Sequence, residues 1–198
     1  THPLVPFAGS GEEILYYIDR RRDLHLHVRT VTLETNYRTA TVAMGDELRA
    51  FAEAAGFPRH ALILRSTAAD AKHALHKGLQ TREGLEAAFA ESREASKDGR
   101  VHVETDMRAH LNPTRMRAIA GLALELAGRL ATSCPECGAP GWGQVAVERG
   151  LPCAWCGAET GRVRAEIHGC AQCGHRESRA PFHGLEEADP GECPRCNP

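Results

Sequence analysis

The sequence predicts an α/β domain, with a small parallel or mixed sheet and packed helices, followed by a C-terminal double zinc ribbon. Two observations predict this organisation. Residues 1–131 alternate β-rich runs with amphipathic helical segments, an order typical of a sheet covered by helices. Residues 132–198 hold all eight cysteines of the chain. We therefore expect an α/β domain over residues 1–131 and a zinc-ribbon domain over residues 132–198.

The cysteines occur as four CxxC pairs. Two thiolates separated by two residues reach one ion from a single tight turn, and two such turns complete the tetrahedral four-sulfur site that suits Zn²⁺. Glycine follows three of the pairs and asparagine follows the fourth, and both residue types tolerate the positive φ that such turns use. We expect two structural zinc ions held by Cys134, Cys137, Cys153, Cys156, Cys170, Cys173, Cys193 and Cys196.

The spacing of the CxxC pairs leaves open which pairs share an ion. Sequential pairing joins the first pair to the second and the third to the fourth, and the spacing does not exclude an interleaved arrangement. Because cysteines already supply eight ligands, we expect His168 and His175 at the surface. The tail has few apolar residues, so metal binding is expected to supply its folding free energy, on the order of 10 kcal/mol per site. A disulfide framework and an iron–sulfur cluster are disfavoured alternatives.

Composition restricts the location and the partners of the chain. It has no apolar run long enough to cross a membrane and no signal-peptide pattern, which favours the cytoplasm. Residues 133–198 carry six Lys and Arg against nine Asp and Glu. Since binding to a phosphate backbone needs a basic surface, this acidic tail argues against nucleic acid and favours a protein partner.

The first part of the chain contains several predicted elements. Ser10 to Glu13 form a capping-box pattern followed by apolar residues, which predicts a helix ending at residues 20–22. Residues 24–33 alternate in polarity and predict a strand with His25 and His27 on an exposed face. Further helices are predicted over residues 46–55, 68–77 and 81–99, the last with Thr81 as its N-cap, and further strands over residues 61–65 and 100–103.

The longest predicted helix leads directly into the cysteine-rich tail. Asn112 is placed at its N-cap and Pro113 at its first position. A stripe at spacings of three and four is expected to be buried, consisting of Met116, Ile119, Ala123, Leu126 and Leu130. Three clear strands make a thin sheet, and the chain begins at Thr1 within a predicted loop. We therefore expect part of the domain to lie upstream.

Two strand ends share one polar pattern. Residues 33–38 (LETNYR) and 103–108 (VETDMR) both read apolar, Glu, Thr, Asn or Asp, bulky, Arg. Because ligands bind beyond the carboxyl ends of strands in open α/β sheets, we expect these side chains to meet at one site. The alternative is that they form turns and helix caps satisfied by local hydrogen bonds.

The predicted site combines carboxylates with arginines. Its oxygen ligands suit Mg²⁺ as a candidate ion, and its guanidinium groups suit a phosphate or carboxylate beside a helix N-terminus. Lys77 and Gly78 are possible loop contributors, with an ordinary helix C-cap as the alternative. The residues assigned to the site are Glu34, Asn36, Arg38, Glu104, Asp106, Arg108, His110 and Arg115.

The segment from Glu104 to Met116, followed by the first CxxC pair, resembles an uncharacterised bacterial domain-of-unknown-function family. In that family a similar ETDMRAH-NPTRM segment precedes a tail with four CxxC pairs. The resemblance covers most of the chain, and it implies a further N-terminal α/β portion. The family has no assigned activity, so the resemblance implies no catalytic residue.

Two functions follow from these patterns. The first is a zinc-binding protein whose α/β domain has a ligand or catalytic site for a small molecule bearing phosphate or carboxylate. The second is a zinc-ribbon module that binds a protein or nucleic acid, with the α/β domain as its scaffold. A third, structural interpretation is that the tail stabilises the last helix and a dimer.

Overall fold

The computed structural model describes residues 10–68 and 75–198. The loop predicted over residues 1–9 and most of the helix predicted over residues 68–77 lie outside the described residues. The chain divides into two compact units, residues 1–13 with 29–122 and residues 14–28 with 123–198. Within the described residues, none of the helices has the length and apolar character needed to span a bilayer.

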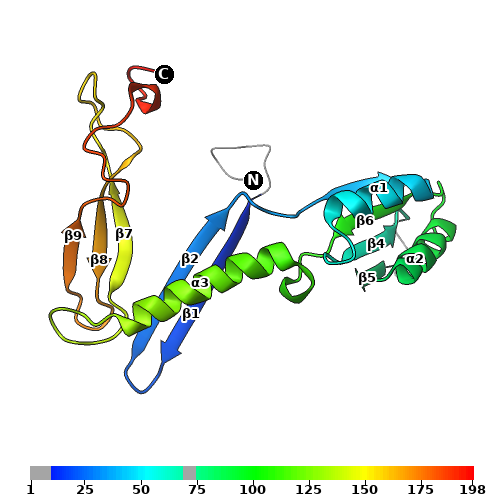
Figure 1. Cartoon of the computed structure of the whole chain (residues 1–198), viewed down its shortest axis with the longest axis horizontal. Helices are drawn as coiled ribbons and strands as arrows, with labels where there is room; N and C mark the ends of the chain where they lie inside the picture. The colour runs from blue at the N-terminus through cyan, green and yellow to red at the C-terminus, as the bar shows by residue number, and fades with distance from the viewer. Residues whose placement is uncertain (1–9, 69–74) are drawn as a thin grey trace. The chain divides into compact units, whose positions relative to one another are not determined.

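The first unit contains a four-stranded sheet in the order β3-β6-β4-β5 (Figure 1). Its strands are β3 (Thr39–Val42), β4 (Leu62–Ser66), β5 (Leu75–Leu79) and β6 (Val101–Thr105). Every neighbouring pair in this sheet is antiparallel. The prediction of a parallel or mixed sheet is therefore wrong, although the mixed α/β class is confirmed. Strand β5 also shows that the described end of the helix predicted over residues 68–77 is extended.

The antiparallel sheet arises because each helical crossover skips one strand. Helix α1 (Gly45–Ala55) connects β3 to β4, and α2 (Arg82–Glu94) connects β5 to β6. Strands β3 and β4 run in the same direction with β6 between them, and β5 and β6 enclose β4 in the same way. These are two split βαβ units. The alternation of strands and helices is the same as in a parallel sheet, so local sequence does not distinguish the two.

Both helices pack against one face of the sheet. A single apolar cluster contains Leu48 and Ala52 of α1, Leu85 and Phe89 of α2, and the inward residues of three strands, among them Leu64. Thr81 is the N-cap of α2, because its hydroxyl accepts a hydrogen bond from the Gly84 N–H at 3.1 Å. The other face of the sheet presents polar side chains, and there His102 lies 3.7 Å from Glu104.

The segment after residue 10 is a strand, so the helix predicted from its capping-box pattern is wrong. Strands β1 (Gly11–Asp19) and β2 (Leu24–Thr32) form a separate two-stranded sheet. The Asp19 carboxylate closes the connecting turn by accepting hydrogen bonds from the N–H groups of Arg21 and Arg22. The β-branched and aromatic residues of β1 alternate in exposure, and this period of two prevails over the capping pattern. The strand predicted over residues 24–33 is confirmed.

Helix α3 (Pro113–Ala131) begins as predicted and runs from the first unit into the second. The side-chain carbonyl oxygen of Asn112 accepts a hydrogen bond from the Arg115 N–H at 3.1 Å, which confirms the predicted N-cap. The predicted buried stripe is wrong, because none of its residues is buried and Met116 and Ala123 are exposed, whereas Leu122 is the buried residue of this helix. The domain boundary after residue 131 stays a prediction, since this helix belongs to both units.

Candidate metal centres

The cysteine-rich tail is built around a three-stranded antiparallel sheet. Its strands are β7 (Gly143–Arg149), β8 (Val163–Gly169) and β9 (Arg176–Arg179), which stand side by side in Figure 1. Each CxxC turn lies before, between or after these strands. Because the chain reverses direction at each strand, consecutive turns fall at alternate ends of the sheet, roughly 20 Å apart for seven residues.

The alternating strands bring the turns together in an interleaved way. The first metal group consists of Cys134, Cys137, Cys170 and Cys173, and the second consists of Cys153, Cys156, Cys193 and Cys196. In each group the four sulfur atoms all lie within 4.8 Å of one another. The first CxxC pair is thus joined to the third and the second to the fourth, which decides between the two arrangements that the spacing left open.

The sulfur separations match a tetrahedral metal site. The Sγ atoms of Cys134 and Cys173 are 3.8 Å apart, and those of Cys156 and Cys193 are 3.7 Å apart. Four sulfur ligands at about 2.3 Å from a central Zn²⁺ would be separated from one another by about 3.8 Å. In the described part of the chain, these two groups are the sets of three or more Cys, His, Asp or Glu side chains that can hold an ion.

The backbone of each turn curls back on itself after its second cysteine. The N–H of Gly138 donates to the Cys134 carbonyl at 2.9 Å, and Asn197 donates to Cys193 in the same way at 2.8 Å. Gly138, Gly157 and Gly174 have positive φ, as predicted. Asn197 does not, so the positive φ expected after the fourth pair is wrong.

Backbone N–H groups favour a thiolate in each metal group. Burial raises the pKa of Cys170, but the N–H groups of Cys173 and Gln172 and the thiols of Cys173 and Cys134 together lower it more, to about 7. At Cys173 the His175 N–H lowers the pKa, whereas burial and the neighbouring thiols raise it more, to about 12. The second group repeats this division, with the pKa of Cys193 lowered to about 7. A divalent cation therefore has to displace protons from the remaining thiols.

The first metal group has a small core of its own. Trp142 is buried against Cys134 and Cys170, and its ring stacks on His175 with 5.4 Å between the centroids. Arg179 lies over the same indole at 6.0 Å. His168 and His175 belong to neither metal group, which agrees with their expected absence from the ligand set. His168 is nevertheless largely covered, because its side chain is only 18% exposed.

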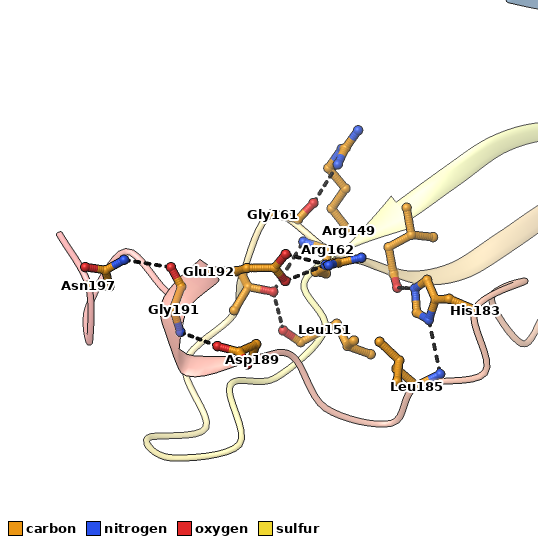
Figure 2. A network of polar contacts seen from close by, with 12 residues as sticks. Arg149, Leu151, Gly161, Arg162, His183, Leu185, Asp189, Gly191, Glu192 and Asn197 are labelled. Carbon is orange, nitrogen blue, oxygen red and sulfur yellow. Dashed lines mark hydrogen bonds and ion pairs between the residues drawn. The ribbon is translucent and has the colours of Figure 1, made fainter. Parts of the chain in front are cut away.

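Hydrogen bonds and one ion pair hold the second metal group in place (Figure 2). The Arg162 guanidinium forms a fork with the Glu192 carboxylate at 2.5 Å, which joins the loop before β8 to the short 3₁₀ helix Pro190–Glu192. This contact raises the pKa of Arg162 and lowers that of Glu192. The Asn197 amide donates to the Gly191 carbonyl at 2.8 Å. Polar contacts thus fix the C-terminal residues 181–198, which contribute no strand to the sheet.

The predicted strand-end cluster contains a buried carboxylate. Asp106 is fully buried and accepts hydrogen bonds from the Arg108 side chain, the Arg108 N–H and the Gly78 N–H. Burial raises the pKa of Asp106, but the bonds from Arg108 and Gly78 lower it more, so its net shift is downward. Through these hydrogen bonds the Asp106 carboxylate connects the segment after β6 to Gly78 in β5. Gly78 therefore takes part through its backbone N–H, whereas Lys77 is exposed.

Arg115 forms a second pair, with a partner that the sequence did not indicate. Its guanidinium binds the Glu13 carboxylate through two nitrogens and the Met107 carbonyl through the third, at 2.6 Å. These contacts lie at a cavity of about 170 Å³. The lining residues come from β1, from residues 32–36 and from residues 107–118. They are Gly11, Glu12, Glu13, Thr32, Glu34, Thr35, Asn36, Met107, Thr114, Arg115 and Ala118.

The two similar segments therefore lie close together, but they do so through antiparallel pairing and not at the carboxyl ends of parallel strands. Strand β3 follows the first segment and pairs antiparallel with β6, so the Arg38 N–H reaches the Thr105 hydroxyl at 3.0 Å. Glu34, Asn36 and Arg115 line the cavity. Glu104 instead lies on the open sheet face beside His102, and His110 is exposed in the 3₁₀ helix Ala109–Leu111.

Among the described residues, the carboxylates of the cluster do not gather into a group of three that could hold an ion. Asp106 is paired with Arg108, whereas Glu104 lies beside His102 on the sheet face. No group of metal-binding side chains that includes Glu34, Glu104 or Asp106 exists among the described residues. The predicted Mg²⁺ site is therefore not supported. Glu13 was missed because its capping-box context suggested a helix, and only recognition of β1 as a strand would have placed it at the cavity.

The interleaved pairing predicts how metal content responds to paired substitutions. The double variant Cys134→Ser/Cys170→Ser removes two ligands from the first metal group and none from the second. The chain should therefore retain about one metal ion after loading with excess Zn²⁺. In Cys134→Ser/Cys153→Ser each ion loses a ligand, so less metal should remain. Elemental analysis after gel filtration measures both contents. The opposite ranking would show that the pairs are joined sequentially.

Asp106→Asn should destabilise the first unit by about 2 kcal/mol, because it removes charge-assisted bonds from a buried position. Since the native pKa is depressed, the advantage of Asp106 is fully present above the ordinary carboxyl range. It should disappear as the pH falls through the depressed pKa. Urea unfolding at several pH values measures this, with Asp46→Asn on the surface as the matched control. Equal effects of the two substitutions would contradict the structural role of Asp106.

Comparisons with known proteins identify the family of the chain. No curated protein matches the chain, and no solved structure does. The family described as a domain of unknown function, DUF6671, matches residues 1–198. This match includes the two split βαβ units and the two metal groups. The chain belongs to the DUF6671 family.

Proposed function

We propose that this protein binds two structural Zn²⁺ ions and that its first unit binds a small molecule bearing phosphate or carboxylate. The all-sulfur ligand sets support zinc, because soft thiolates at tetrahedral separations suit this ion. Each group supplies four protein ligands and so leaves no coordination position for a substrate. The proposed role of the ions is therefore to hold the tail in shape.

The cavity at Arg115 supports the proposed ligand site. It joins the two similar segments, and its walls offer the hydroxyls of Thr32, Thr35 and Thr114 beside the Arg115 guanidinium. These groups can donate hydrogen bonds to the oxygen atoms of an anion. Arg115 is 37% exposed, so a ligand can reach it from solvent. The ligand anion would take the place of the Glu13 carboxylate on the guanidinium fork.

Other members of the predicted cluster have supporting roles in this proposal. Asp106 and Arg108 hold the turn after β6, and Asn112 caps the helix that carries Arg115. The Asn36 amide donates to the Ala55 carbonyl at 2.9 Å and so fixes the first segment. Glu34 is exposed at the cavity and is the carboxylate that we propose as a base, should the site be catalytic. Arg38 is an exposed cation two residues beyond the cavity wall.

The zinc proposal predicts about two zinc atoms per chain by elemental analysis of freshly purified protein. Because the ligands must be thiolates, lowering the pH should release the metal as protons compete for the sulfur atoms. Release should be accompanied by a change in the fluorescence of Trp142, which packs against the first metal group. Stoichiometric iron, or freely alkylated thiols in the folded protein, would contradict this proposal.

The ligand proposal predicts opposite effects for the two members of the Arg115–Glu13 pair. Arg115→Ala should weaken the binding of inorganic phosphate or citrate about tenfold, because a charge-assisted bond is lost. Glu13→Gln should strengthen binding, since the guanidinium then has no competing carboxylate. Isothermal titration measures both affinities, with the exposed Arg117→Ala as control. If both substitutions weaken binding equally, or if none of the anions binds, the site is structural.

A further inference from the structure

One CxxC turn differs from the other three at its exposed tip. The residue before the second cysteine is Glu136, Gln172 and Arg195 in three of the turns, and Trp155 in the remaining one. All four positions are exposed, and Trp155 is 80% exposed. The polar residues at the equivalent positions show that the turn does not require an aromatic side chain to form. The indole therefore lies in solvent without a part in holding the metal.

The surroundings of Trp155 are strongly acidic. We define the second lobe as residues 150–162 and 181–198, which hold the second metal group. It contains two arginines and five acidic residues, Glu159, Glu186, Glu187, Asp189 and Glu192. An ion of charge +2 held by four thiolates adds a further formal charge of −2. The field at this lobe therefore repels phosphates and attracts cations.

The backbone brings acidic residues beside the tryptophan turn. Ala188 pairs with Cys153 in a parallel bridge, and the Ala154 N–H donates to the Ala188 carbonyl at 3.1 Å. This contact places the segment 186–189 along the turn that carries Trp155. Glu192 is already paired with Arg162, and Asp189 caps the short 3₁₀ helix. Glu186 and Glu187 are exposed, and within the described residues neither has an ion-pair partner.

We propose that the second lobe is a docking surface for an arginine-rich peptide segment of a partner protein. An arginine side chain can stack on the exposed indole of Trp155 while its neighbours pair with Glu186 and Glu187. Cation–π stacking and charge complementarity together select this occupant. The lobe contains a second aromatic residue in solvent, Phe182, which is 86% exposed. This inference is independent of the ligand site in the first unit.

The alternative occupants fit the surface less well. A nucleic acid could stack a base on Trp155, but its phosphates would face the unpaired carboxylates. A lipid bilayer with anionic head groups would meet the same repulsion. A neutral apolar peptide would leave Glu186 and Glu187 without partners. The arginine-rich segment is the occupant that satisfies both the indole and the carboxylates.

Fluorescence anisotropy of the zinc-loaded full chain with a labelled arginine-rich peptide tests this proposal. Trp155→Gln, which copies the residue at Gln172, should weaken binding about fivefold, because the stacking contact is lost. Glu186→Gln/Glu187→Gln should weaken it by a similar factor and reduce its dependence on salt. A glutamate-rich peptide should not bind. Zinc content should stay unchanged in every variant, which separates a docking role from a structural one.

Matched controls make the result specific to the second lobe. Glu136→Gln alters the equivalent tip in the first metal group, and Glu86→Gln removes an exposed carboxylate from α2. Both should leave the affinity for the peptide unchanged. Equal affinities for wild type and Trp155→Gln would overturn the proposal. So would tighter binding of a single-stranded oligonucleotide through Trp155, which would assign the surface to nucleic acid.

Discussion

The antiparallel course of β7, β8 and β9 is the constraint on which the tail depends. Strands β7 and β8 each lead into a CxxC turn at opposite ends of the sheet, and the fourth turn follows β9 after residues 180–192. The four cysteines of one ion must therefore come from the first and third pairs, or from the second and fourth. Strand direction, rather than distance along the sequence, determines which thiols share an ion.

The two units are stabilised by different means. In the first unit, one apolar cluster lies between two helices and one face of the sheet, so burial of apolar surface is the main driving force. In the cysteine-rich sheet, the buried cluster is Cys134, Trp142 and Cys170 with Ala139 beside it, which is too small to act alone. Polar contacts such as Arg162–Glu192 add to this cluster, and metal held by the two cysteine groups would take the place of a larger core.

Sequence reasoning succeeded where a local pattern has one structural meaning. The CxxC pairs, the Thr81 and Asn112 caps and the strand after residue 24 are all of this kind. It failed where two structures share one local pattern. The capping-box motif at residues 10–13 lies in a strand, and alternating strands and helices accompany an antiparallel sheet.

The candidate site shows the same division. The repeated pattern at residues 33–38 and 103–108 identified two segments that do lie together, because β3 pairs with β6. It did not show which way each side chain points, since that depends on register. Glu34 and Glu104, which occupy equivalent positions in the two segments, have different surroundings, the first at the cavity and the second beside His102 on the sheet face. The pairing of the cysteine turns would have been accessible from the alternating residues of β7 and β8, had these been recognised as strands.

Interleaving also links the two ions to each other. Strand β7 begins beyond a turn of the first group and ends before a turn of the second, and β8 makes the return connection. Ordering these strands around one ion therefore preorganises the ligands of the other, so the second ion binds to a chain that has already lost much of its conformational freedom. Loading of the two groups with metal would then be cooperative, so that at limiting metal a chain would more often hold both ions or neither than one alone.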